Sequence, residues 1–116
     1  YVHVSDLADA HVTSVRRLLG GGVGGNFNLG TGRGFSVKRV LDVITAVTGQ
    51  QLTVEKGERR QGDPPVLVAD ASLAKRELGF APKLSDLETV VATAWAWHRR
   101  AHPRRTQAEG ARLRAF

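Results

Sequence analysis

The stretch Asn26-Phe27-Asn28-Leu29-Gly30-Thr31-Gly32-Arg33-Gly34-Phe35-Ser36 decides the fold class of this chain. Residues 26–29 are predicted to form a strand. The glycines behind them allow a tight turn, because glycine tolerates backbone conformations closed to other residues. Ser36 is a good N-cap for a helix that begins directly after the turn. A strand, a glycine turn and a helix in this order predict an α/β protein.

The glycine turn resembles a dinucleotide-binding fingerprint without matching it. That fingerprint requires G-x-G-x-x-G, and here the third glycine, Gly34, comes one position early, with Phe35 in its place. No long βαβ unit with a suitably placed acidic residue follows. We therefore interpret the turn as a tight strand-to-helix connection near a ligand.

Outward from this stretch, short strands are predicted at 1–4 and 52–55, and helices lie between the strands. The first helix would be capped by Ser5 or Asp6, and its apolar face would consist of Ala8, His11, Val12, Val15, Leu18 and Leu19. The second would run from the Ser36 cap to Gly49, with an apolar stripe of Val37, Val40, Leu41, Ile44 and Val47.

Two more helices are predicted in the last third of the chain. Asp70 or Ser72 would cap a short helix that Gly79 closes, and Ser85 with Glu88 would form the capping box of the last helix. The apolar face of that helix would consist of Leu87, Val90, Val91, Ala94, Trp95 and His98. Strands this few and short predict a piece of a larger α/β protein, as does a sequence that begins at Tyr1 and contains no methionine.

The charge is concentrated at one end of the 116 residues. The net charge is +6, and residues 99–116 hold six arginines against Glu109, a balance of +5. We expect residues 1–103 to fold and residues 104–116 to be a basic, disordered tail. We do not expect nucleic-acid binding, because aromatic residues do not alternate with these arginines.

Other compositional features restrict the class of protein further. The chain has no apolar run long enough to span a membrane, so we expect no membrane association. It contains no cysteine, which excludes a disulfide scaffold and a thiolate metal site and fits the cytoplasm.

The best candidate for ligand binding is the run Arg59-Arg60-Gln61-Gly62-Asp63. Arginine grips phosphate through paired hydrogen bonds, and a carboxylate can accept hydrogen bonds from sugar hydroxyls. The run predicts a nucleotide-sugar grip. The alternative is a solvated charged turn before a strand.

Candidates for catalysis are missing from the sequence. The four histidines lack metal-ligand spacing, and neither a G-x-S-x-G elbow nor a P-loop is present. Asp6 and Asp86 are adequately explained as caps or solvated residues, Trp95 and Trp97 as packing residues, and His3 as a core residue of a strand. The sequence offers binding chemistry without a visible base or nucleophile.

The chain resembles the C-terminal, substrate-binding part of the UDP-glucose 4-epimerases, in the extended short-chain dehydrogenase/reductase superfamily. The matching blocks run over residues 1–11, 27–36, 59–63, 69–72, 75–82 and 87–98. The resemblance implies a Rossmann-type α/β enzyme with NAD as cofactor that interconverts UDP-glucose and UDP-galactose, cytoplasmic and homodimeric when complete.

The resemblance also implies residue roles. Arg60 would contact the UDP diphosphate, Asp63 would accept hydrogen bonds from the ribose hydroxyls, and Tyr1 would lie beside the nucleotide. The NAD fingerprint and the catalytic Tyr-x-x-x-Lys pair are absent, because Tyr1 is the single tyrosine and position 5 is Ser. The piece alone is therefore expected to be inactive. The alternatives are a non-catalytic nucleotide-sugar-binding domain and part of a related dehydratase or epimerase.

Overall fold

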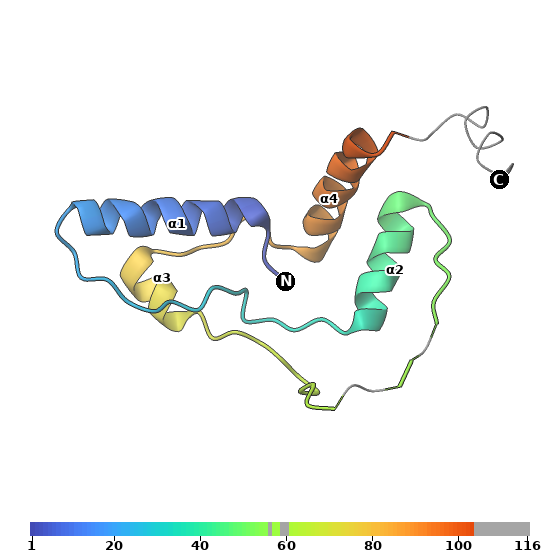
Figure 1. The fold of residues 1–116 in the computed structure, drawn as a ribbon, viewed down its shortest axis with the longest axis horizontal. Coiled ribbons are helices and arrows are strands. Elements are labelled where there is room, and N and C mark those ends of the chain that lie inside the picture. Colours follow the sequence, from blue (N-terminus) through green and yellow to red (C-terminus); the bar gives the residue numbers. More distant parts are fainter. Residues whose placement is uncertain (56, 59–60, 104–116) are drawn as a thin grey trace, which may run out of the picture.

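The computed structural model describes residues 1–55, 57–58 and 61–103, and these residues form four helices in two pairs (Figure 1). Helix α1 (Val4–Leu19) packs against α3 (Ser72–Leu78), and α2 (Val37–Thr48) packs against α4 (Leu87–Ala101). Long irregular segments connect the pairs. No helix in this part of the chain is long and apolar enough to cross a membrane.

The predicted alternation of strands and helices is not found in the described residues. The expected strand at 1–4 is wrong, because Val4 already begins α1. The expected strands at 26–29 and 52–55 lie in segments without regular secondary structure. A strand exists only when a neighbouring strand completes its backbone hydrogen bonds. The backbone hydrogen bonds of the described residues include none from 26–29 or 52–55 to another segment.

Helix α1 is capped by a residue other than the predicted ones. His3 is the N-cap, and its ring Nδ1 accepts a hydrogen bond from the backbone N–H of Ser5 at 3.0 Å. Asp6 does not act as the cap, since its carboxylate binds a distant loop.

The buried face of α1 is also the opposite of the predicted one. Asp6 and Ala10 are buried, whereas the predicted apolar face is open to solvent. Val12, Val15 and Leu19 expose 47%, 54% and 83% of their surfaces. Helix α1 therefore turns its more polar side to the rest of the chain and leaves an apolar stripe uncovered.

The α2/α4 pair follows the sequence pattern more closely. Ser36 caps α2 by accepting from Arg39 N at 3.1 Å, and Gly49 ends it in the left-handed conformation, both as predicted. The most buried residues of the pair are Val43 and Leu87. Val43 lies outside the predicted stripe, and Val37, which was predicted to belong to it, is exposed.

The caps of the last two helices differ from the predictions by one residue each. Helix α4 is capped by Asp86, which accepts from Thr89 N at 2.8 Å. Ser85 cannot serve, because its hydroxyl belongs to a buried cluster. The N-cap position of α3 is Ala71, while Asp70 accepts from Ser72 N at 2.9 Å.

A small core joins α1 to α3. Its buried members are Ala10, Ala71, Ala74 and Phe80, and Val2, Phe27 and Leu29 pack around them. At the edge of this core, the Arg17 guanidinium donates to Glu77 O at 2.9 Å and to Val23 O at 3.1 Å. None of the described large side chains is fully buried.

Candidate functional site

A buried polar cluster ties the start of the chain to the loop before α4. At its centre the Asp6 carboxylate accepts from Lys83 N at 3.0 Å and from Leu84 N at 3.0 Å, and the Ser85 hydroxyl also donates to it. Ser85 Oγ in turn accepts from His3 N at 2.8 Å. His3, Asp6 and Ser85 expose 7% or less of their surfaces, so these bonds are shielded from water.

The cluster keeps Asp6 ionised. Burial alone would raise the pKa of the Asp6 carboxyl, since a charge is costly to remove from water. The hydrogen bonds from Ser85, Lys83 and Leu84 outweigh burial, and the pKa lies below its ordinary value. Asp6 is thus a charged structural residue at neutral pH, a role that its interpretation as a cap or solvated residue missed.

His3 connects the same cluster to α4. Because Nδ1 accepts from Ser5 N, the ring is left with Nε2 as the donor. Nε2 lies 2.9 Å from Thr93 Oγ1, and Thr93 Oγ1 donates onward to Thr89 O at 2.8 Å. His3 is buried, as expected, but at a helix N-terminus and not in a strand.

The hydrogen-bonding pattern separates this cluster from a nucleophilic triad. A triad needs the imidazole ring against the serine hydroxyl, whereas Ser85 is bound by the His3 backbone N–H. The serine, histidine and aspartate here hold chain segments together and have no arrangement for acyl transfer.

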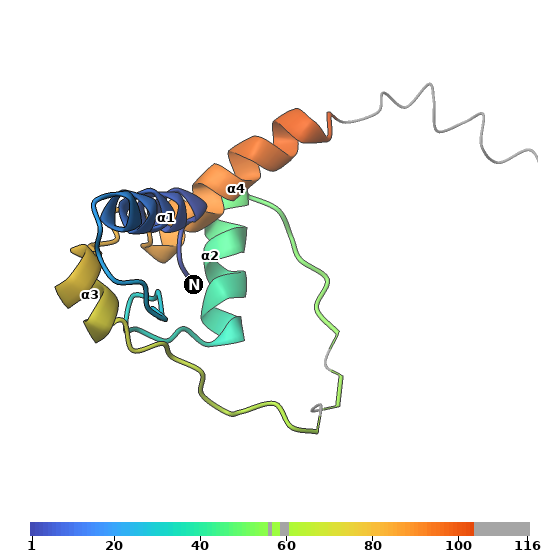
Figure 2. The ribbon, with the colours of Figure 1, turned by 60° about the vertical axis from the view of Figure 1, so that its left-hand side comes forward.

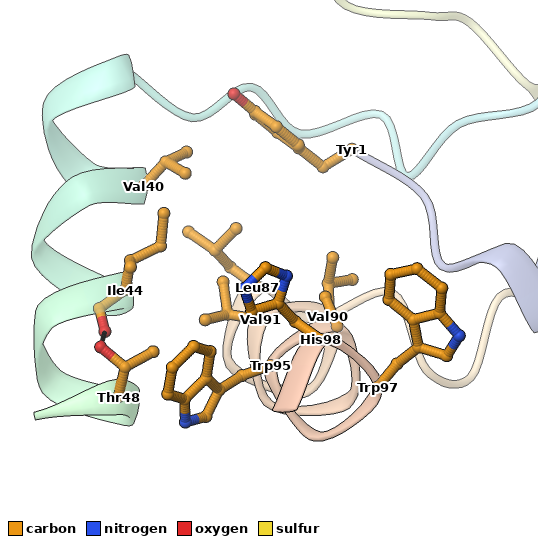
Figure 3. A pocket seen from close by; sticks show the side chains of 11 residues that line it. Tyr1, Val40, Ile44, Thr48, Leu87, Val90, Val91, Trp95, Trp97 and His98 are labelled. Carbon is orange, nitrogen blue, oxygen red and sulfur yellow. Dashed lines mark hydrogen bonds between the residues drawn. The ribbon is translucent and has the colours of Figure 1, made fainter. Parts of the chain in front are cut away.

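Tyr1 borders an open apolar cavity of about 410 Å³ between α2 and α4. Figure 3 shows its ring at the rim, across from Val40 and Ile44 of α2, while the side chains of α4 form the floor. Tyr1 is 58% exposed. The cavity walls offer few polar groups, so they suit packing of an apolar surface better than binding of a diphosphate.

The arginine loop is only partly described. Arg59 and Arg60 lie outside the described residues. Gly62 has a φ of 91° in the turn that leads to Asp63, which is exposed. The described segment that follows, residues 61–65, lies apart from the helices and from the N-terminus in both ribbon views (Figures 1 and 2). The structure therefore does not bring Tyr1 and Asp63 together.

Two glycines of the glycine turn allow close packing of the chain. A Cβ on Gly30 would lie 2.7 Å from the Ala69 Cβ, and one on Gly34 would lie 3.0 Å from Val68. The space that these glycines leave is filled by the chain itself. The space beside Gly32 is open, and Gly32 has a φ of 73°. The predicted strand-to-helix turn is found only as a bend at Gly32, because residues 26–29 form no strand, and its placement near a ligand stays a prediction.

The C-terminal end of α4 carries a row of aromatic rings. His98 stacks on His102 at 4.5 Å and on Trp95 at 5.7 Å between ring centroids. Trp97 is 60% exposed, so the expectation that it packs inside does not hold in this chain. The described residues contain no group of three or more side chains suited to hold a metal ion.

Comparison with known proteins connects these features to one enzyme. No family model matches the chain. Among curated proteins, the UDP-glucose 4-epimerase of Halalkalibacterium halodurans is 48% identical over 103 residues, which are 89% of this chain and 30% of that protein. The enzyme of Streptococcus mutans is 45% identical over 98 residues, 84% of this chain and 29% of that protein.

Solved structures agree with the sequence comparison. A UDP-glucose 4-epimerase matches with a TM-score of 0.84 and 39% identity over 91% of this chain and 32% of its own. The Brucella ovis enzyme in complex with NAD matches with a TM-score of 0.76 and 44% identity, over 82% of this chain and 30% of its own. The Bifidobacterium longum enzyme in complex with NAD+ and UDP matches with a TM-score of 0.73 and 32% identity, over 86% of this chain and 29% of its own.

The chain thus spans about a third of the length of the proteins that it matches. Over that third it shares both their sequence and their backbone. The chain is a relative of the UDP-glucose 4-epimerases and matches the C-terminal part of these enzymes.

Proposed function

We propose that this chain is the substrate-binding portion of an NAD-dependent UDP-glucose 4-epimerase, which interconverts UDP-glucose and UDP-galactose. The observation that carries the proposal is a match in both sequence and backbone over some nine-tenths of the chain. The NAD site and the catalytic Tyr-x-x-x-Lys pair would belong to the Rossmann-type remainder of the enzyme. This chain would supply the residues that bind UDP.

Three residues carry the proposed grip. Arg60 would bind the diphosphate, Asp63 the ribose hydroxyls, and Tyr1 would lie beside the nucleotide. A complex of the Bifidobacterium longum relative with NAD+ and UDP supports UDP as the ligand class. Since Tyr1 and Asp63 lie apart in this structure, the ribose and diphosphate side of the site would close only when the rest of the enzyme is present.

The exposed apolar surfaces give independent support for a missing neighbour. Val15 and Leu19 of α1 and Trp97 of α4 are more than half exposed, and large exposed apolar side chains that gather on one surface often mark a protein–protein interface. The remaining two-thirds of an epimerase would cover these side chains and remove them from water.

The homodimer and a cytoplasmic location belong to the same proposal. The basic tail, residues 104–116, lies outside the described residues and is assigned no role.

A chimera tests the proposal directly. Residues 1–103 would replace the matching third of the Halalkalibacterium halodurans enzyme, which is 48% identical to this chain over 103 residues. We expect the chimera to convert UDP-galactose to UDP-glucose, and the chain alone, given the same substrate and NAD, to yield no product. A folded chimera without turnover, or turnover by the chain alone, would contradict the proposal.

Arg60→Ala in the chimera tests the grip itself. The variant should bind UDP more weakly by about 1.5–3 kcal/mol, the contribution of a hydrogen bond to a charged group. Lys38→Ala, which removes an exposed cation on α2, is the matched control and should leave binding unchanged. Equal binding constants for Arg60→Ala and the parent chimera would remove the phosphate role.

A further inference from the structure

We propose that Thr93 and Ser85 are positioning residues for nucleotide binding: through His3 they fix the segment that presents Tyr1. This inference rests on the proposed function, because it takes Tyr1 as a neighbour of the bound nucleotide. It assigns to the hydrogen bonds of His3 a task in addition to their contribution to stability.

Two hydrogen bonds fix the position of His3, two residues after Tyr1. Its backbone N–H donates to Ser85 Oγ at 2.8 Å, and its ring Nε2 donates to Thr93 Oγ1 at 2.9 Å. The two partners come from different places, the loop before α4 and the second turn of α4. Together with the Nδ1 bond to Ser5 N, they fix the backbone and the ring of His3 at once.

Tyr1 and His3 lie against the same face of α4. Tyr1 lines the cavity between α2 and α4, and His3 lines the adjoining one. The two cavities share three wall residues, spaced three and four apart along one helical face: Val90, Ala94 and Trp97. A shift of His3 along this face would therefore carry Tyr1 with it.

Tyr1 has few contacts of its own to hold it. Its side chain is 58% exposed, and the hydrogen bonds between described residues include none from its hydroxyl. A binding residue is effective only when its own position is fixed by neighbouring contacts. His3, two residues away and buried, is the nearest fixed point, and Thr93 and Ser85 are what fix it.

The test uses Thr93→Val in the active chimera. Valine keeps the branched shape and removes the acceptor of the His3 ring. We expect the KM for UDP-galactose to rise about fivefold, the ratio that corresponds to one hydrogen bond, while kcat stays within about twofold. Thr93→Ser keeps the hydroxyl and should restore the parent KM.

Thr13→Val is the matched control. Thr13 also donates to the carbonyl four residues before it, Asp9 O at 2.9 Å, but has no histidine partner among the described residues. It should lose a comparable helical bond without changing KM. A KM rise equal in Thr13→Val and Thr93→Val, a loss confined to kcat, or a failure of Thr93→Ser to rescue would overturn the positioning role.

Tyr1→Ala separates this inference from the function on which it rests. If Tyr1→Ala raises KM and Thr93→Val does not, the positioning role is wrong and the nucleotide role of Tyr1 stands. If Tyr1→Ala leaves KM unchanged, the nucleotide role is wrong, and the positioning proposal falls with it. Ser85→Ala should raise KM in the same direction as Thr93→Val, because it frees the His3 backbone N–H.

Discussion

At the scale of single residues, the buried carboxylate of Asp6 is expected to contribute strongly to the stability of this chain. It is 5% exposed and accepts hydrogen bonds from two backbone N–H groups and a hydroxyl. Asp6→Asn should lower the free energy of unfolding at pH 7 by about 1.5–3 kcal/mol, since it takes the charge from this set of bonds. Asp9→Asn, on the exposed side of α1, is the control and should have little effect.

The same carboxylate predicts how stability depends on pH. The pKa of folded Asp6 lies below its ordinary value, so its stabilisation is complete above the unfolded pKa of about 3.9 and is lost as pH falls through the folded pKa. The stability difference between the parent and Asp6→Asn should therefore shrink below about pH 4. Urea unfolding followed by tryptophan fluorescence measures it, and a difference that is constant or grows in acid would contradict the assignment.

The ring of His3 gives a prediction for spectroscopy. Since Nδ1 accepts from Ser5 N and Nε2 faces Thr93 Oγ1, the neutral ring should carry its proton on Nε2. Nitrogen chemical shifts of the imidazole at neutral pH distinguish the two forms. Protonation on Nδ1 would show that the cap bond to Ser5 N does not form in solution. His11, which is exposed on the same helix, provides the reference signal.

At the scale of elements, the segments before α2 and before α3 lie against each other at a glycine. A Cβ on Gly30 would come 2.7 Å from Ala69 Cβ. Two carbon atoms that are not bonded to each other do not approach this closely unless the neighbouring chain shifts. Gly30→Ala should therefore destabilise the chain by about 1–3 kcal/mol, the usual cost of overpacking. Gly57→Ala is the control, because the space around Gly57 is open. Equal urea midpoints for the two variants would show that the contact yields without cost.

The sequence predicted the helices better than any other element, for reasons specific to helices. Helix signals are local: Ser36, Gly49 and Gly79 act within one turn of the ends that they mark. A strand depends on a partner that can lie anywhere in the chain, which explains why the expectation for 26–29 did not hold. The role of Asp6 was unpredictable for a similar reason, since its partner loop lies some 77 residues away.

At the scale of the whole molecule, the apolar stripe of α1 is a surface without a neighbour among the described residues. The helical pattern had predicted Val12, Val15 and Leu19 as the packed face, and the structure leaves them at 47%, 54% and 83% exposure. The prediction of the packed face is therefore wrong for the chain by itself, and the stripe is a candidate interface with another part of the enzyme. A chain that spans about a third of its relatives is expected to show such unmatched faces.

An interface on α1 predicts a substitution that abolishes assembly and leaves the folding of the chain nearly unchanged. Val15→Glu should change the unfolding free energy of the chain by no more than about 0.5 kcal/mol, because the side chain is already exposed. When the chain is mixed with the N-terminal two-thirds of the Halalkalibacterium halodurans enzyme, the parent should form a one-to-one complex and Val15→Glu should not, since the complex would bury an unpaired charge. Ala46→Glu, on an exposed position of α2, controls for added charge and should still assemble. Analytical ultracentrifugation measures complex formation for the parent and for both variants. A complex with Val15→Glu as stable as the parent's would show that the stripe of α1 faces solvent in the epimerase as well.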